Sequence, residues 1–89
     1  MASAEKILQA VLSGRSDANL RFGALRVLFR ALGFDERIRG HHFIYTRRDI
    51  AEILNIQPAS NGKAKPYQIK QIRGIITKYG LRIGRTDEI

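Results

Sequence analysis

Two stretches of the chain repeat apolar residues at helical spacing, and a segment that favours strands lies between them. The first stripe consists of Phe22, Leu25, Leu28, Phe29 and Leu32. The second consists of Ile69, Ile72, Ile75 or Ile76, and Tyr79. Apolar residues three and four positions apart form one face of a helix, and that face has to be buried. The chain must therefore bring two amphipathic helices onto a common core.

Residues with special backbone preferences mark the ends of both helices. Asn19 is expected to be the N-cap of the first helix, and Gly33 to stop it, with Phe34 folded back on the last turn. The second helix is expected to begin at Pro66, because proline suits the first helical position, and to end at Gly80.

Three strands are expected between the helices, from Asp35 to Arg39, His41 to Arg47 and Ile50 to Gln57, with a turn or bulge at Gly40. Residues 58–65 are rich in turn formers and are expected to form a loop. The order helix, three strands, helix indicates an α+β fold in which both helices cover one face of the sheet. The other face would remain free for a ligand.

The first 18 residues are expected to form a short helical extension. Ser3 is a candidate N-cap and Gly14 a candidate stop, with Ile7, Leu8, Val11 and Leu12 on one face between them. The predicted organisation is thus an extension over 1–18, one domain over 19–82 and a tail over 83–89. A total of 89 residues suffices for one small domain.

The charge of the chain is one-sided. The net charge is +8, and no acidic residue occurs between Ile53 and Thr86, where seven cationic residues fall. Such a distribution is typical of a chain that binds a polyanion, so nucleic acid or an acidic protein partner is favoured over a merely solvated surface. The absence of cysteine fits a reducing cytosol, and no apolar run is long enough for a membrane span or a signal peptide.

Both histidines of the chain, His41 and His42, directly follow Gly40 in the second predicted strand. Imidazole titrates near neutral pH, so a histidine beside a cationic surface suits proton transfer in phosphodiester chemistry. Neighbours on a regular strand point to opposite faces, so only one of the two would face a substrate. The same divergence makes a metal site at this pair improbable.

The chain resembles the HicA-type toxins of bacterial HicAB toxin–antitoxin systems. The resemblance covers roughly residues 19–81 and rests on the segments 32–34, 39–45 and 65–72. It implies a fold like a double-stranded-RNA-binding domain, α-β-β-β-α, here with an extra N-terminal helix. It also implies a cytoplasmic ribonuclease that cuts mRNA without a metal or other cofactor and is silenced by a HicB-type antitoxin.

In that family a Gly-Ser-His motif carries the catalytic histidine. Gly40 matches its glycine and His42 its histidine, while His41 replaces the serine. Many members have a second histidine in a Pro-x-His motif, but Pro58 is followed by Ala59 and Ser60. His42 is therefore the candidate general acid or base, and no second family histidine is available.

The remaining candidates are contacts to RNA. Lysine and arginine suit phosphate, and an aromatic ring at the start of a helix suits base stacking, although packing of Tyr67 is an equal alternative. Tyr45, three residues past His42, is expected in the core, with base stacking as the alternative if its face of the sheet is open. The predicted RNA contacts are Arg39, His41, Arg47, Lys63, Lys65, Tyr67, Lys70 and Arg73.

Two functions remain in competition. The first is a metal-independent endoribonuclease acting as a toxin, with RNA and a HicB-type antitoxin as partners. The second is a non-catalytic double-stranded-RNA-binding module, which the same fold and charge would serve. A basic adaptor for an acidic protein is a third possibility, and charge alone cannot separate it from a toxin that binds its antitoxin.

Overall fold

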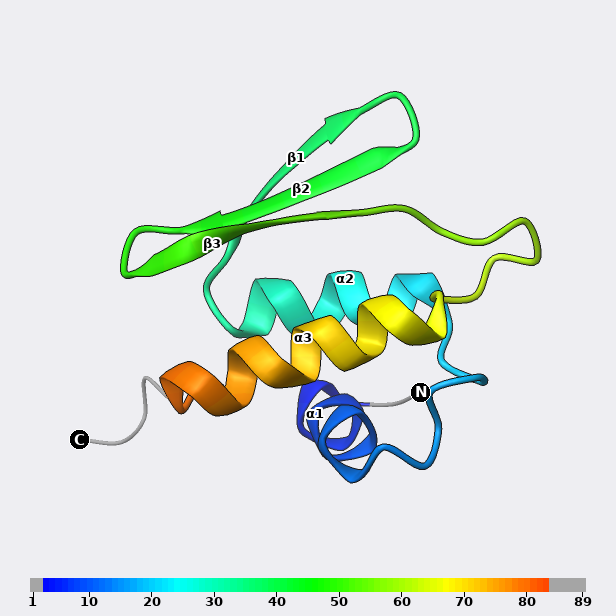
Figure 1. Cartoon of the computed structure of the whole chain (residues 1–89), viewed down its shortest axis with the longest axis horizontal. Helices are drawn as coiled ribbons and strands as arrows, with labels where there is room; N and C mark the ends of the chain where they lie inside the picture. The colour runs from blue at the N-terminus through cyan, green and yellow to red at the C-terminus, as the bar shows by residue number, and fades with distance from the viewer. Residues whose placement is uncertain (1–2, 84–89) are drawn as a thin grey trace.

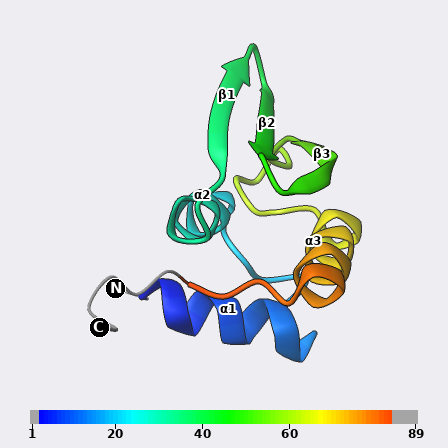
Figure 2. The same cartoon turned by 90° about the vertical axis from the view of Figure 1, so that its left-hand side faces the viewer.

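A computed structural model describes residues 3–83 and arranges them in three layers (Figure 1). Its elements in chain order are α1 (Ala4–Ser13), α2 (Phe22–Ala31), β1 (Asp35–Arg39), β2 (His42–Arg47), β3 (Ile50–Ile56) and α3 (Pro66–Tyr79). The strands form an antiparallel sheet in the order β1-β2-β3. Figure 2 shows α2 and α3 side by side under one face of that sheet, with α1 beneath them.

The expected α+β order of helix, three strands and helix is confirmed, together with the additional N-terminal helix. The predicted tail over 83–89 lies, apart from Ile83, outside the described residues. In the part of the chain that is described, no helix is both long and apolar enough to cross a membrane.

The predicted start of α2 is wrong by two residues. Its N-cap is Arg21 and not Asn19, which lies in the preceding turn. The carbonyl of Leu20 accepts a hydrogen bond from the backbone N–H of Ala64 at 2.8 Å, and Arg21 forms an isolated antiparallel bridge with Lys63. This backbone pairing keeps residues 20 and 21 extended and delays the first helical turn.

The other predicted helix ends are confirmed. Gly33 has φ 86°, and the N–H of Phe34 bonds back to the carbonyl of Phe29 at 3.0 Å, as expected for a chain that folds over its last turn. Gly80 closes α3 in the left-handed conformation with φ 61°. Ser3 caps α1 by accepting a hydrogen bond from the N–H of Lys6.

His41 was expected to begin the second strand, and this is wrong. Arg39 pairs with His42 across β1 and β2, so Gly40 and His41 form a two-residue turn between them. Gly40 has φ 58° and His41 does not have a positive φ. These signs match a type II′ hairpin turn, which requires glycine at its first position and twists with the strands. Gly40 thus allows the tight turn that places His41 outside the sheet.

The inner face of the sheet is held by aromatic packing on α2. The ring of Tyr45 is 1% exposed and stacks on Phe29 with centroids 4.0 Å apart. Phe43 meets Phe22 edge to face at 4.8 Å. The predicted core position of Tyr45 is therefore confirmed.

The phenol of Tyr45 is not left unpaired in this core. It donates a hydrogen bond of 2.6 Å to Glu36, whose carboxylate also receives two bonds from Arg26. Burial, followed by the hydrogen bond to Glu36, raises the pKa of the Tyr45 phenol. Arg26 and Tyr45 together lower the pKa of Glu36. The edge strand β1 is tied to α2 by this network.

A second polar network joins β3 to the end of α3. The carboxylate of Glu52 accepts hydrogen bonds from Lys78 Nζ at 2.7 Å and from the hydroxyl of Tyr79 at 2.6 Å. Lys78, and then Tyr79, lower the pKa of Glu52 to about 2. The ordinary value is 4.5.

Glu52 should make the free energy of unfolding depend on pH in the acid range. Because its pKa is lower in the folded chain, the unfolded chain binds the proton first as the pH falls. The stabilisation is complete above about pH 4.5 and is lost as the pH falls toward 2. Glu52→Gln should therefore flatten the urea-unfolding free energy against pH over that window.

Lys78→Gln removes the largest cause of the shift and should flatten the same window in part. The difference between parent and variant should shrink at high salt, because the pair is partly exposed. Equal pH slopes in the parent and in Glu52→Gln would contradict this account.

Candidate nucleic-acid interface

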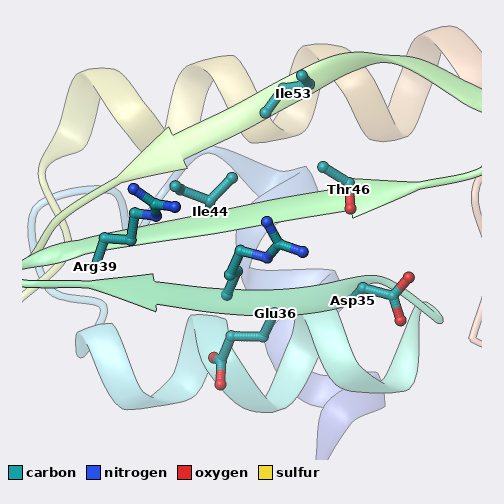
Figure 3. A pocket seen from close by; sticks show the side chains of 7 residues that line it. Asp35, Glu36, Arg39, Ile44, Thr46 and Ile53 are labelled. Carbon is teal, nitrogen blue, oxygen red and sulfur yellow. The ribbon is translucent and has the colours of Figure 1, made fainter.

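The sheet face turned away from α2 and α3, called here the open face, carries a shallow groove of about 700 Å³. Figure 3 looks onto this face, with the helices behind the sheet and Arg39, Ile44 and Ile53 in front of it. The residues that line the groove are Asp35, Glu36, Arg37, Arg39, Ile44, Thr46 and Ile53. The groove thus has an apolar middle, where Ile53 is 65% exposed, and charged residues along β1.

His42 belongs to the same face. Side chains alternate along β2, and since Phe43 and Tyr45 pack inward, His42, Ile44 and Thr46 point outward. Its cross-strand partner Arg39 and its same-face neighbour Ile44 both line the groove. The exposed imidazole therefore lies directly beside the groove.

The ring of His42 has one side-chain partner among the described residues. Its Nδ1 is 3.0 Å from Oδ1 of Asn55, on the neighbouring strand β3. Asn55 opposes Ile44, so the contact runs diagonally across the two strands. His42 is consequently flanked by Arg39 on one side and Asn55 on the other.

His41 is exposed in the turn that precedes His42. The two histidines are therefore not on opposite faces of one strand, as a regular strand would require. Because the turn lies beyond the last β1–β2 pair, His41 stands at the tip of the hairpin. Residues 3–83 contain no group of three or more His, Asp or Glu side chains that lie close enough to one another to hold a metal ion.

Arg47 and Arg73 are engaged by the fold itself. Arg47 donates from Nη1 to the carbonyl of Leu32 at 2.8 Å and pairs with Asp49 at 2.9 Å. Arg47 is also five residues along β2 from His42, which is roughly 16 Å on an extended strand.

Arg73 lies in the seam between α3 and α1. Its guanidinium donates to the carbonyl of Val11 at 2.8 Å and to both oxygens of Asp17 at 3.1 and 3.0 Å. The hydrogen bond to Asp17, and then the negative charge of Asp17, raise the pKa of Arg73. Because α1 lies on the far side of the helix layer from the sheet (Figure 2), Arg73 is not brought together with His42.

The other predicted contacts gather at or near the start of α3. Lys63 and Lys65 are half-buried, Lys70 is exposed, and Tyr67 is 66% exposed, which leaves its ring unpacked. Lys65 is the N-cap of α3, and its first turn contains no acidic residue. The start of α3 and the β1–β2 turn lie toward the same end of the long axis in Figure 1.

The start of α2 adds charge at this end. Arg21 is the N-cap of α2 and forms the backbone bridge with Lys63. The first turn of α2 also lacks an acidic residue. Two helix N-termini with their partial positive charges thus meet three cationic residues. We call Arg21, Lys63 and Lys65 the cationic end.

Arg37 and Asn55 were missed by the sequence analysis. Arg37 could have been found, because strand alternation puts it on the same face as Arg39 two residues later. Asn55 carried no such signal, since its contact with His42 depends on the register between β2 and β3. The acidic residues Glu36, Asp49 and Glu52 each form an ion pair with a cationic side chain.

Comparison of the chain with family models, curated proteins and solved structures gives no match.

Arg73 and Lys70, on the same helix, should respond differently to mutation. Arg73→Ala breaks the contacts with Val11 and Asp17, so α1 should loosen and Tm should fall. Lys70→Ala removes an exposed charge and should leave Tm unchanged. Thermal melts followed by circular dichroism measure both variants. A parental Tm for Arg73→Ala would show that this ion pair does not hold α1.

Proposed function

We propose that this protein is an endoribonuclease that cuts mRNA without a metal, as the toxin of a bacterial type II toxin–antitoxin system. His42 is its general acid or base. The observation that carries the proposal is the exposed imidazole of His42 on the open face, beside Arg39 and the groove. The α-β-β-β-α order agrees with a fold like a double-stranded-RNA-binding domain and with the resemblance to HicA-type toxins.

Cleavage by the RNA's own 2′-hydroxyl needs little from the protein. His42 takes the proton of the 2′-hydroxyl, the O2′–P bond forms, and the P–O5′ bond breaks as O5′ gains a proton from solvent. Negative charge builds on the phosphate oxygens during this exchange. Arg39, the cross-strand partner of His42, supplies a permanent positive charge at that point.

The groove offers a path for the strand on either side of the cut. Arg37 and Arg39 both line it from β1 and suit phosphate, while Ile44 and Ile53 offer an apolar surface to unstacked bases. The cationic end adds long-range attraction for the phosphate backbone. Tyr67, with an exposed ring at the start of α3, suits stacking on a base.

A HicB-type antitoxin would silence such a nuclease by covering His42 together with its arginines. Acidic side chains that compete for the phosphate contacts would do so with little new structure. The proposed setting for toxin, antitoxin and mRNA is the cytoplasm.

One observation favours the alternative of a non-catalytic RNA-binding module. On the open face of the described sheet, His42 is the only imidazole, since His41 stands in the turn. A binding module needs no acid or base, and its RNA complex would be sensitive to salt without any strand scission.

His42→Ala should strongly slow cleavage while keeping the fold. We expect the cleavage rate of a long single-stranded RNA in EDTA to fall by about 10²- to 10⁴-fold, the usual contribution of a general acid or base. His41→Ala is the matched control, because it removes the neighbouring imidazole and keeps His42. Growth arrest on expression should likewise be lost in His42→Ala and kept in His41→Ala.

RNA binding without scission by the parent would favour the binding module. Equal cleavage by the parent and by His42→Ala would remove His42 from the mechanism.

Charge on the groove should appear as salt dependence of RNA binding. Arg37→Ala and Arg39→Ala should each reduce the slope of log affinity against log salt by about 1, if each contacts one phosphate. Arg48→Ala, in the turn between β2 and β3, removes the same charge away from the groove and should leave the slope unchanged. Fluorescence anisotropy with the cleavage-deficient His42→Ala chain measures all three. An equal loss of slope in Arg48→Ala would mean that RNA is attracted by the overall positive charge of the protein and is not bound specifically at the groove.

A further inference from the structure

We propose that Asn55 is a positioning residue that fixes the proton of neutral His42 on Nδ1 and leaves Nε2 free to act as the base. The starting observation is the 3.0 Å distance between Oδ1 of Asn55 and Nδ1 of His42. The inference deepens the proposed function, on which it rests for its effect on cleavage but not for the contact itself.

Buried neighbours fix the backbone on both sides of this contact. Leu54 and Ile56, which flank Asn55, are fully buried, so the side chain of Asn55 is turned outward. On β2 the next residue after His42 is Phe43, which packs on Phe22. Phe43 also pairs with Ile56, so core packing and the strand ladder set the register that brings Asn55 to His42.

The chemistry of the two groups then selects the tautomer. A neutral imidazole has one nitrogen that donates and one that accepts, and an amide oxygen only accepts. Nδ1 must therefore carry the proton when it faces Oδ1, and Nε2 carries the lone pair. Once Nε2 gains a proton, Nδ1 still donates to Oδ1, so this contact serves both protonation states.

The reversed amide would serve only one of them. If Nδ2 of Asn55 faced the ring, Nδ1 would have to accept. Once the imidazolium formed during catalysis, its Nδ1–H and the Nδ2–H of Asn55 would be two donors facing each other. A group that gains and loses a proton in each turnover is better held by an acceptor. The amide is also neutral, so it orients the ring without adding the negative charge of a carboxylate.

The three strands divide the proposed work between them. β1 provides Arg39 opposite His42, β2 provides the ring, and β3 provides the acceptor that orients it. All three positions belong to hydrogen-bonded strands and not to loops, so the ring is oriented before any RNA arrives. Preorganisation of this kind is what a general base requires.

Nitrogen-15 NMR of the full chain with labelled histidine tests the proposal directly, with His41→Ala used to assign the two rings. We expect the neutral His42 ring of the parent to carry its proton on Nδ1. Asn55→Ala should move the neutral ring toward the Nε2–H form and lower the RNA cleavage rate by about 10- to 100-fold, by analogy with the loss of a group that orients a metal-bound histidine.

Asn55→Asp is the conservative variant and should behave differently from Asn55→Ala. It retains an acceptor, so the Nδ1–H form should persist. The added carboxylate should also shift the titration of the ring, and with it the pH–rate profile, to higher pH. Asn19→Ala, an exposed asparagine in the turn before α2, is the control and should change neither readout.

An Nε2–H ring in the parent, or an unchanged tautomer in Asn55→Ala, overturns the positioning role. If the parent fails to cut RNA but shows the Nδ1–H ring, and Asn55→Ala loses it, the positioning role stands and the ribonuclease proposal fails. The two ideas are thus separated by one set of samples.

Discussion

The stack of Tyr45 on Phe29 determines which side of the sheet faces solvent. With the ring centroids 4.0 Å apart and Tyr45 buried, β2 can present only its alternate residues to solvent. A shift of one residue would bury His42 and expose Tyr45 at once. The orientation of the only imidazole in the sheet is thus enforced by aromatic packing on its opposite side, and through the β2–β3 register the same packing brings Asn55 to it.

Much of the fold could be predicted because it follows from local signals. Helical stripes, stop glycines and Pro66 define α2 and α3, and the position of Tyr45 follows from strand alternation. The start of α2 was mispredicted because a long-range backbone pair, Leu20 with Ala64, overrides the capping preference of Asn19. His41 was misassigned because Gly40 was not recognised as the first residue of a two-residue turn.

The candidate site was less predictable, since side chains of one type serve different purposes in it. Arg39 lines the groove, whereas Arg73 ties α1 to α3 and Arg47 holds the end of α2. Nothing in the sequence distinguishes these arginines, because the difference lies in partners distant along the chain. Composition predicts how much positive charge there is, and only tertiary contacts reveal how much of it is available.

The edge strand β1 has a consequence of another kind. All five of its residues are exposed, and four of them, Asp35, Glu36, Arg37 and Arg39, are charged. A strand at the rim of a sheet offers unpaired backbone groups to any second strand, which invites edge-to-edge association of copies. Charges along such an edge oppose that association, because pairing would bring them close together and strip them of water. The side chains that could hold RNA at the groove would thus also help to keep the protein from aggregating through its own sheet.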